Sequence, residues 1–205
     1  MIKVNDDIFN FAYGMALADA TRRTDAASIN KTGLSCLLPI VKEYANSVIN
    51  GDHPDFCKYE EKCETALEAV NITIFTFGNI QKLINMTMKY LYVGYYMEPK
   101  YREYFKCCHA PMDARMRDFI FKRYKAKGYE LPKFDKECAW SKMGRKAEES
   151  KYKIDNYFAY QEAIAKLIEE EGHNACTPIE FEFLAFAHAD EPEYEINYNS
   201  FSEVK

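Results

Sequence analysis

The sequence predicts an all-α protein: a single compact multi-helix domain, with room for two helical lobes that flank a cleft. Apolar side chains recur at helical spacing along most of the chain, and proline, glycine and capping residues fall between the periodic segments. Hydrophobic residues make up 48% of the 205 positions, which is enough to form a core. A chain of this length is typical of one domain, here residues 1–205.

Four helices are expected in the first half of the chain, over residues 5–23, 34–49, 54–70 and 78–97. Pro39 forces a kink or a late start in the second helix, and Pro99 ends the fourth. Residues 71–77 are β-branched and aromatic, so they predict a short strand or an extended connector. The side chains expected to face the core from the first two helices are Ile8, Phe11, Ala12, Met15, Leu37, Val41, Tyr44 and Val48.

Three more helices are expected after this point. Asp113 is placed to cap a helix over residues 114–126, with Gly128 as its stop. Thr177 and Glu180 form a capping box for the last helix, which runs to His188. Residues 129–144 are irregular and contain the single tryptophan, and the tail over residues 190–205 is acidic. The helix over residues 147–171 is expected to be amphipathic, with one stripe of Ile154, Phe158, Gln161, Ala165 and Ile168.

The cysteines and the N-terminus predict an intracellular, cytoplasmic protein. Seven scattered cysteines, an odd number, are not typical of a disulfide framework and indicate reduced thiols. The first residues become acidic at once and lack the apolar stretch of a signal peptide. No segment is long and apolar enough for a membrane span, so we expect no membrane association.

Charge is distributed unevenly along the chain. The middle segment, residues 75–153, has eighteen Lys and Arg against nine Asp and Glu, a net charge of +9. The flanking segments carry net charges of −4 and −10. Screening limits an exposed charge to a range of about 8–10 Å, so local charge decides encounters with a polyanion. The basic segment is therefore either a groove for phosphates or acidic partners, or a solvated face balanced by the acidic tail.

A lysine near the start of the fourth helix is the first candidate for chemistry. Lys82 falls on one helical stripe with Asn85, Lys89 and Tyr92 or Tyr96, while apolar side chains cover the other faces. Partial burial of such an amine would lower its pKa and free it for nucleophilic attack. The alternative is an ordinary solvent-exposed stripe.

The second candidate is the segment Cys107-Cys108-His109-Ala110-Pro111-Met112-Asp113. Pro111 restricts the residue before it, and Asp113 then lies at a helix N-terminus, where the dipole stabilises a carboxylate. The alternative is a plain N-cap, with His109 hydrogen-bonded in a turn. Adjacent cysteines rarely chelate one tetrahedral ion, and no second ligand pair is present, so we expect no metal and no other cofactor.

Together these segments resemble the helix–hairpin–helix DNA glycosylase superfamily. The matching pattern is Q-K-x-x-N-x-x-x-K-Y at residues 81–90, followed about thirty residues later by an aspartate in a P-x-D turn. The chain is most similar to divergent archaeal-type 8-oxoguanine DNA glycosylases over residues 75–117, with a weaker echo at Trp140-Ser141-Lys142. It also resembles bacterial proteins that carry F-G-x-x-Q-K-x-x-N and C-H-x-P-x-D segments.

The resemblance implies a DNA glycosylase, with or without lyase activity, that removes a damaged or modified base. It implies that Lys82 attacks the sugar carbon C1′ and that Asp113 orients the lysine and stabilises positive charge on the sugar. The process would be base repair or the excision of modified bases from phage DNA. The residues expected to bind the substrate are Gln81, Asn85, Lys89, His109 and Trp140.

The chain departs from the family pattern at the hairpin. The usual L-P-G-x-G segment before the lysine is absent, and only Gly78 stands there. Since that hairpin binds phosphate in the family, phosphate contacts must come from other residues. The candidates are the cations of the following helix: Arg115, Arg117, Lys122, Arg123, Lys125 and Lys127.

Two other functions fit the sequence. One is a non-catalytic protein of a phage or mobile element that binds a nucleic-acid-dependent host machine through its basic segment or acidic runs. The other is a helical domain of a different enzyme class. A glycine-rich phosphate loop, a Ser-His-Asp arrangement and an R-x₄₋₆-H ribonuclease motif are all missing from the sequence.

Overall fold

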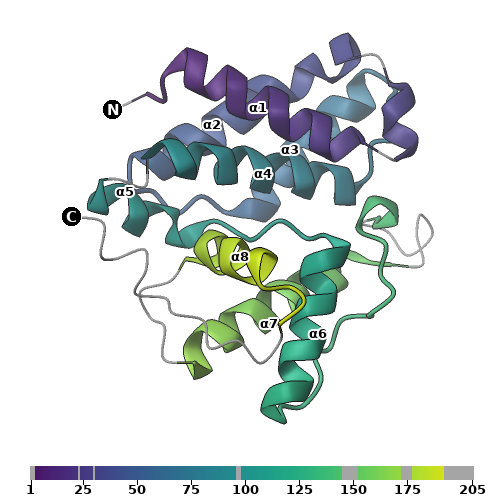
Figure 1. Ribbon diagram of the computed structural model, residues 1–205. Helices are drawn as coiled ribbons and strands as arrows, with labels where there is room; N and C mark the ends of the chain where they lie inside the picture. Colours follow the sequence, from purple (N-terminus) through teal and green to yellow (C-terminus); the bar gives the residue numbers. More distant parts are fainter. Residues whose placement is uncertain are drawn as a thin grey trace. The chain divides into compact units, whose positions relative to one another are not determined.

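The computed structural model describes residues 3–22, 24–29, 31–95, 98–144, 152–171 and 177–191 (Figure 1). Regular structure within these ranges is helical, and the all-α prediction is confirmed. The chain divides into two compact units, Met1–Cys108 and His109–Lys205. Across the described ranges, we find no helix that combines the length and the apolar character needed to cross a membrane.

The first unit is built around α4 (Phe77–Tyr95), which contacts four other helices. It lies along the whole of α1 (Asp6–Thr21), and the two helices run side by side in Figure 1. The other elements of this unit are η1 (Asp25–Ser28), η2 (Lys31–Leu37), α2 (Leu38–Ile49), α3 (Phe56–Ala69), α5 (Pro99–Tyr104) and η3 (Phe105–Cys107).

Two polar side chains of α4 bond to the C-terminal end of α1. The Asn79 side-chain amide donates to the carbonyl of Ala20 over 2.7 Å, and the Tyr90 hydroxyl donates to the Asp19 carboxylate over 2.6 Å. A buried amide without a partner costs about 1–3 kcal/mol. These bonds therefore hold the C-terminal end of α1 against α4.

The predicted core face of α1 is wrong. Ile8, Phe11 and Met15 are 43%, 65% and 43% exposed, and only Ala12 of the expected set is buried. The sequence of α1 is apolar on two sides, so periodicity alone offered two choices. The side of α1 that holds three alanines is the buried one, because small side chains allow a neighbouring helix to approach closely. The buried face consists of Phe9, Ala12, Tyr13, Ala16, Leu17 and Ala20.

Prolines and caps set the other boundaries of the first unit. Pro39 lies in the first turn of α2, so the helix starts late, and all four core residues expected of that region are buried. Residues 71–76 form a connector, and the strand considered for this region is not formed. The described part of α4 ends at Tyr95, before Pro99, and Pro99 opens the short helix α5, which was not expected from the sequence.

The second unit consists of α6 (Ala114–Lys127), η4 (Trp140–Lys142), α7 (Ile154–Glu170) and α8 (Pro178–Ala187). Helices α6, α7 and α8 contact one another in pairs. The predicted Asp113 cap and the Thr177–Glu180 capping box are both present. Gly128 ends α6 with a φ of 69°, a conformation that glycine adopts without strain.

The predicted start and face of α7 are wrong. Tyr152 and Lys153 precede the helix, and residues 147–151 lie outside the described ranges, as do residues 192–205 of the acidic tail. Phe158 and Gln161 of the expected stripe are only partly buried. The expected stripe left out Tyr157 and Tyr160, whose hydroxyls find partners within the unit. The face that packs inward holds Tyr157, Tyr160, Ala163, Ile164 and Leu167.

The two faces of α1 give a direct test of its orientation. We expect Phe9→Ala to lower the free energy of unfolding by about 3–5 kcal/mol, because it leaves a cavity where a fully buried ring had packed. Phe11→Ala removes an exposed ring and should change it by less than about 0.5 kcal/mol. Urea unfolding followed by circular dichroism measures both, and a larger loss for Phe11→Ala would contradict the described face.

Candidate active site

Lys82 lies on α4, within a stretch that is buried from Phe77 to Met88. Its exposed fraction is 7%. Asn85 and Tyr92, which share its stripe, are also buried, whereas Lys89 is partly buried and Tyr96 lies outside the described ranges. The solvent-exposed alternative for this stripe is therefore wrong for Lys82 and Asn85.

The start of α4 determines where Lys82 is held. The Asn79 Oδ1 atom accepts from the backbone N–H of Thr76 over 3.0 Å, and the Thr76 hydroxyl donates to the same oxygen over 2.8 Å. The Gln81 amide donates to the carbonyl of Gly78 over 3.0 Å, and Asn85 donates to the Gln81 oxygen over 3.2 Å. Hydrogen-bonded side-chain amides thus precede and follow Lys82 along the helix, at Asn79, Gln81 and Asn85.

Asp113 caps α6 in the second unit. Its Oδ1 atom accepts the backbone N–H of Met116 over 2.9 Å, and the side chain is partly buried. The carboxylate also acts on Tyr160 of α7, whose pKa is raised well above its usual value by burial, by Asp113 and by Glu182. Asp113 is thus both a helix cap and a negative charge close to a buried tyrosine.

The backbone that leads to Asp113 is held against α7. The Gln161 side chain donates to the carbonyl of Ala110 over 2.8 Å and accepts the Ala110 N–H over 3.1 Å, as a neighbouring strand would. The Tyr160 hydroxyl donates to the carbonyl of Pro111 over 3.0 Å. These roles of Tyr160 and Gln161 were not predicted from the sequence. The available signal was the spacing of Tyr157, Tyr160 and Gln161, which places them on one side of a helix.

His109 is part of this bracket. Its Nδ1 atom lies 2.8 Å from the Tyr157 hydroxyl, and its ring meets Phe158 edge to face. Desolvation lowers the His109 pKa from 6.5 to about 4. The imidazole is therefore neutral at pH 7, and it can act there only as a hydrogen-bonding group or as a base.

The predicted site residues are divided between the two units. Lys82, Gln81, Asn85 and Lys89 belong to Met1–Cys108, whereas His109, Asp113 and Trp140 belong to His109–Lys205. The division also cuts the basic segment of residues 75–153 in two. Trp140 is partly buried at the start of η4.

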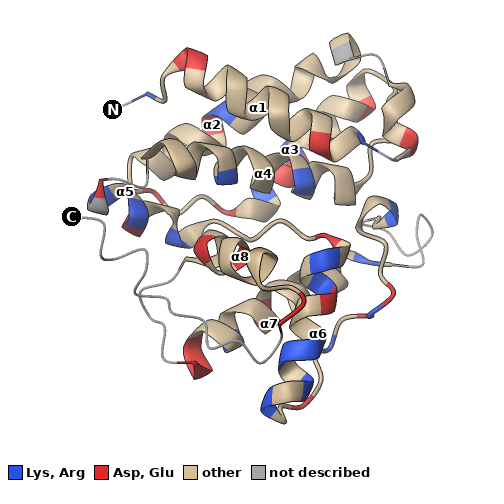
Figure 2. Ribbon diagram, in the orientation of Figure 1, with Lys and Arg blue, Asp and Glu red and all other residues tan. Residues whose placement is uncertain are grey.

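The predicted phosphate-binding cations of α6 differ in their availability. Lys122, Lys125 and Lys127 are exposed, and Figure 2 shows the concentration of basic residues along this helix. Arg115 is exposed and lies over the Phe186 ring at 4.2 Å. Arg117 donates to the carbonyl of Cys138 over 2.9 Å and pairs with Asp118, so its head group is largely engaged.

Arg123 is buried rather than offered to a ligand. Its exposed fraction is 1%, and it binds the Glu171 carboxylate through two bonds of 2.9 and 2.7 Å. This pair joins α6 to the end of α7. Loss of one partner from a buried ion pair typically costs about 3–5 kcal/mol, which is a structural role. The prediction that Arg123 contacts phosphate is therefore wrong, because its head group is buried and bonded to Glu171.

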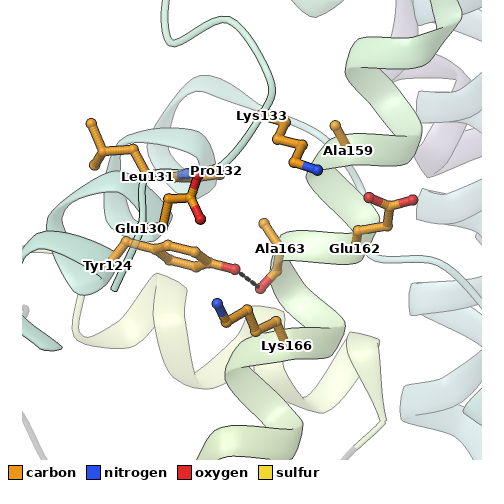
Figure 3. Close-up of a pocket in the computed structure, with 9 residues that line it drawn as sticks. All are labelled: Tyr124, Glu130, Leu131, Pro132, Lys133, Ala159, Glu162, Ala163 and Lys166. Carbon is orange, nitrogen blue, oxygen red and sulfur yellow. Dashed lines mark hydrogen bonds between the residues drawn. The ribbon is translucent and has the colours of Figure 1, made fainter. Parts of the chain in front are cut away.

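Two of the hollows in the described surface are lined by neither Lys82 nor Asp113. One, in the second unit, has a volume of about 130 Å³, well below the roughly 300–1,000 Å³ of typical ligand pockets. Figure 3 shows Tyr124 spanning it to bond the Ala163 carbonyl, with the Lys166 amine beside the ring. The other hollow, of about 460 Å³, lies in the first unit and is lined by Pro39, Lys42, Glu43, Asn46, Ser47 and Asp52.

Metal chemistry receives no support from the described side chains. Among them, no group of three or more His, Cys, Asp or Glu residues is arranged to hold an ion.

Comparisons with protein-family models, curated proteins and solved structures found no match to this chain. The glycosylase resemblance therefore stays a prediction that rests on this chain's own residues.

The pKa of His109 predicts an acid sensitivity. Because its folded pKa of about 4 lies below the ordinary 6.5, its contribution to stability is complete above pH 6.5 and is lost as pH falls through 4. We expect the free energy of unfolding to fall by up to about 1.4 kcal/mol per pH unit in this window from His109 alone.

The variant His109→Gln keeps a hydrogen-bonding group toward Tyr157 but cannot titrate. Its unfolding free energy should therefore change less than that of the wild type between pH 6.5 and 4, as measured by urea titration at a series of pH values. Parallel pH profiles for the two proteins would show that His109 is not desolvated in the folded state.

Proposed function

We propose that the protein is a DNA glycosylase in which Lys82 is the nucleophile. The observation that carries the proposal is the 7% exposure of Lys82 among the amides of α4. Lysine side chains are rarely fully buried in proteins. Buried lysines serve as nucleophiles at carbonyl and sugar carbons in several classes of enzyme. The sequence pattern around Lys82 supplies the substrate class through its resemblance to glycosylases.

The proposed chemistry has two steps, and Lys82 takes part in both. The Lys82 amine attacks C1′ as the bond from C1′ to the base breaks, and one amine proton leaves with the base. The bond between C1′ and the ring oxygen O4′ then breaks as a second amine proton passes to that oxygen, which leaves a Schiff base between Lys82 and the sugar. The Asp113 carboxylate stabilises the positive charge that develops on the sugar in the first step.

Lys82 gives the most direct test of the proposal. We expect borohydride to trap a covalent adduct between the protein and a duplex that carries a modified base. Lys82→Met should abolish the adduct while preserving the aliphatic part of the buried side chain. The assay is gel separation of the adduct across a panel of duplexes with oxidised, alkylated or phage-type modified bases.

Two further variants keep this result interpretable. Lys62→Met removes a lysine on α3 that pairs with Glu43 and should leave the adduct unchanged. Asp113→Asn preserves the helix cap, since Asn caps as well as Asp, but removes the charge and should slow base release. If folded wild type yields neither adduct nor abasic product across the panel, the glycosylase proposal is wrong.

A second candidate is a non-catalytic protein that binds a nucleic-acid-dependent machine. The exposed cations of α6 favour it, because they supply a charged surface without any need for Lys82. Pull-down from lysate separates the candidates: a stoichiometric partner kept by Lys82→Met and lost by the α6 variants below supports binding alone.

The α6 cations predict how DNA affinity depends on salt. Arg115, Lys122 and Lys125 lie seven and three residues apart, so they share one helical stripe. Each phosphate contact contributes about 0.9 to the slope of log affinity against log salt. We expect the double variant Lys122→Gln, Lys125→Gln to lower that slope by about 1.8, as measured by fluorescence anisotropy.

The matched control is Lys100→Gln, which removes an exposed lysine from the same basic segment but on α5. We expect its salt slope to equal that of the wild type. Equal losses from the control and from each α6 position would mean that net charge, rather than the α6 stripe, drives binding.

A further inference from the structure

The outward face of α1 is apolar and open to solvent, and the proposed function does not use it. Ile8, Phe11 and Met15 are 43%, 65% and 43% exposed, and they share one side of the helix. Val93 of α4, which is 52% exposed, extends this face. A Cβ placed on the next residue, Gly94, would lie 3.8 Å from the Ile8 Cγ2 atom. A contiguous apolar surface of this kind is typical of a contact with another molecule.

Gly14 lies in the middle of the same face. Glycine inside a helix is destabilising relative to alanine, so it is used there chiefly where another group must come close to the backbone. Among the described residues, a Cβ on Gly14 would meet nothing within 4 Å, so packing within the first unit gives no reason for a glycine. Ala18, one turn further on, is exposed as well. The two small residues leave space for a second helix against the α1 backbone.

The charges at the two ends of this face have opposite signs. Asp7 lies in the first turn of α1, and Arg22 follows the last residue with a side chain that is 73% exposed. The midpoint of residues 7 and 22 is also the midpoint of residues 11 and 18, between residues 14 and 15. A two-fold axis at this point sets Phe11 opposite Ala18 of a second copy. It also sets Asp7 opposite Arg22 of that copy, and each pairing occurs twice.

We propose that this face of α1 is the interface of a homodimer, in which the α1 helices of two copies pack antiparallel across a two-fold axis between Gly14 and Met15. The proposal is carried by the exposed apolar row, the open space at Gly14, and the match of size and charge in one register. A helix face pairs with itself only if its large and small residues, and its two signs of charge, are placed symmetrically about one point. The outward face of α1 meets this condition.

The charge of α1 argues against a membrane as the occupant. Helices that lie on membranes carry lysine and arginine along the border of their apolar face. Here Asp6, Asp7 and Asp19 stand in the helix, and its basic charge is confined to the residues that follow its end. A second copy of the chain offers both signs of charge, at the places where this face needs them.

The interface is small, so the dimer should be weak. Stable interfaces use about 20–30 residues a side. The face described here has eight: Asp7, Ile8, Phe11, Gly14, Met15, Ala18, Arg22 and Val93. We therefore expect a Kd on the order of 10–100 µM. At a few micromolar the chain is then largely monomeric, and the unfolding of Phe11→Ala described above reports the monomer.

The test is sedimentation equilibrium of the full chain from about 1 to about 500 µM, a range that brackets this Kd. We expect the average mass to rise with concentration from 23.9 kDa toward twice that value. Phe11→Glu should keep the mass of one chain throughout, with an unchanged circular dichroism spectrum because the ring is exposed. The matched control is Leu131→Glu, which charges a 59% exposed apolar residue of the second unit and should leave the dimer intact.

Gly14→Gln separates the dimer from the fold of the monomer. At a few micromolar protein it should move the urea midpoint upward, because a good helix former replaces glycine at an open position. The same side chain holds the two α1 helices apart, so it should weaken the dimer by about tenfold or more. A merely structural role for Gly14 would not produce these opposite effects.

The charged ends test the antiparallel register. Asp7→Lys or Arg22→Glu alone sets like charges opposite each other at both ends, and should weaken the dimer by about tenfold at low salt. The double variant restores opposite charges and should recover the affinity. A chain that stays monomeric at about 500 µM, or a dimer that Phe11→Glu and Leu131→Glu affect equally, would overturn the proposal. A double variant that binds no more tightly than the single ones would overturn the antiparallel register.

Discussion

Burial of α4 from Phe77 to Met88 is the constraint on which the first unit depends. From Phe77 to Met88 the helix has no solvent-facing side, so every polar group on it must find a partner within the protein. The Asn79 side chain donates to the Ala20 carbonyl at the end of α1, and the Thr87 hydroxyl donates to the Leu83 carbonyl over 2.7 Å. Lys82 is set in this environment. Its low exposure is therefore shared with the neighbouring positions of the helix that carries it.

In the second unit, side chains of α7 fix the position of the irregular segment over residues 109–113. Residues 109–113 lack the internal bonds of a helix, and α7 supplies bonds from side chains instead. Gln161 pairs with both backbone groups of Ala110, and Tyr160 reaches Pro111. The segment ends at Asp113, which lies at the start of α6 and accepts the Met116 backbone N–H as the helix cap. Mutations on α7 should thus affect the position of a carboxylate that they do not touch.

Local signals in the sequence predicted most helix ends, because caps and prolines act within a few residues. Asp113, Gly128 and the Thr177–Glu180 box are examples. Helix orientation was harder, since α1 offers two apolar sides and only the fit of its alanines against α4 distinguishes them. In α7 the inward face is built on tyrosines whose hydroxyls are bonded, and composition alone does not reveal such bonds. The burial of Arg123 depends on Glu171, forty-eight residues away, which no local pattern connects to it.

The outward side of α1 has a practical meaning for anyone who handles this protein. Ile8, Phe11 and Met15 form an apolar row on the helix, and Val93 of α4 is 52% exposed. Side chains that contribute little to the core can be replaced at little cost to folding. Glutamate or lysine at these positions would reduce the exposed apolar area of the surface. The row is thus the natural place to engineer solubility, or to attach a fluorophore through an introduced residue, without disturbing α4.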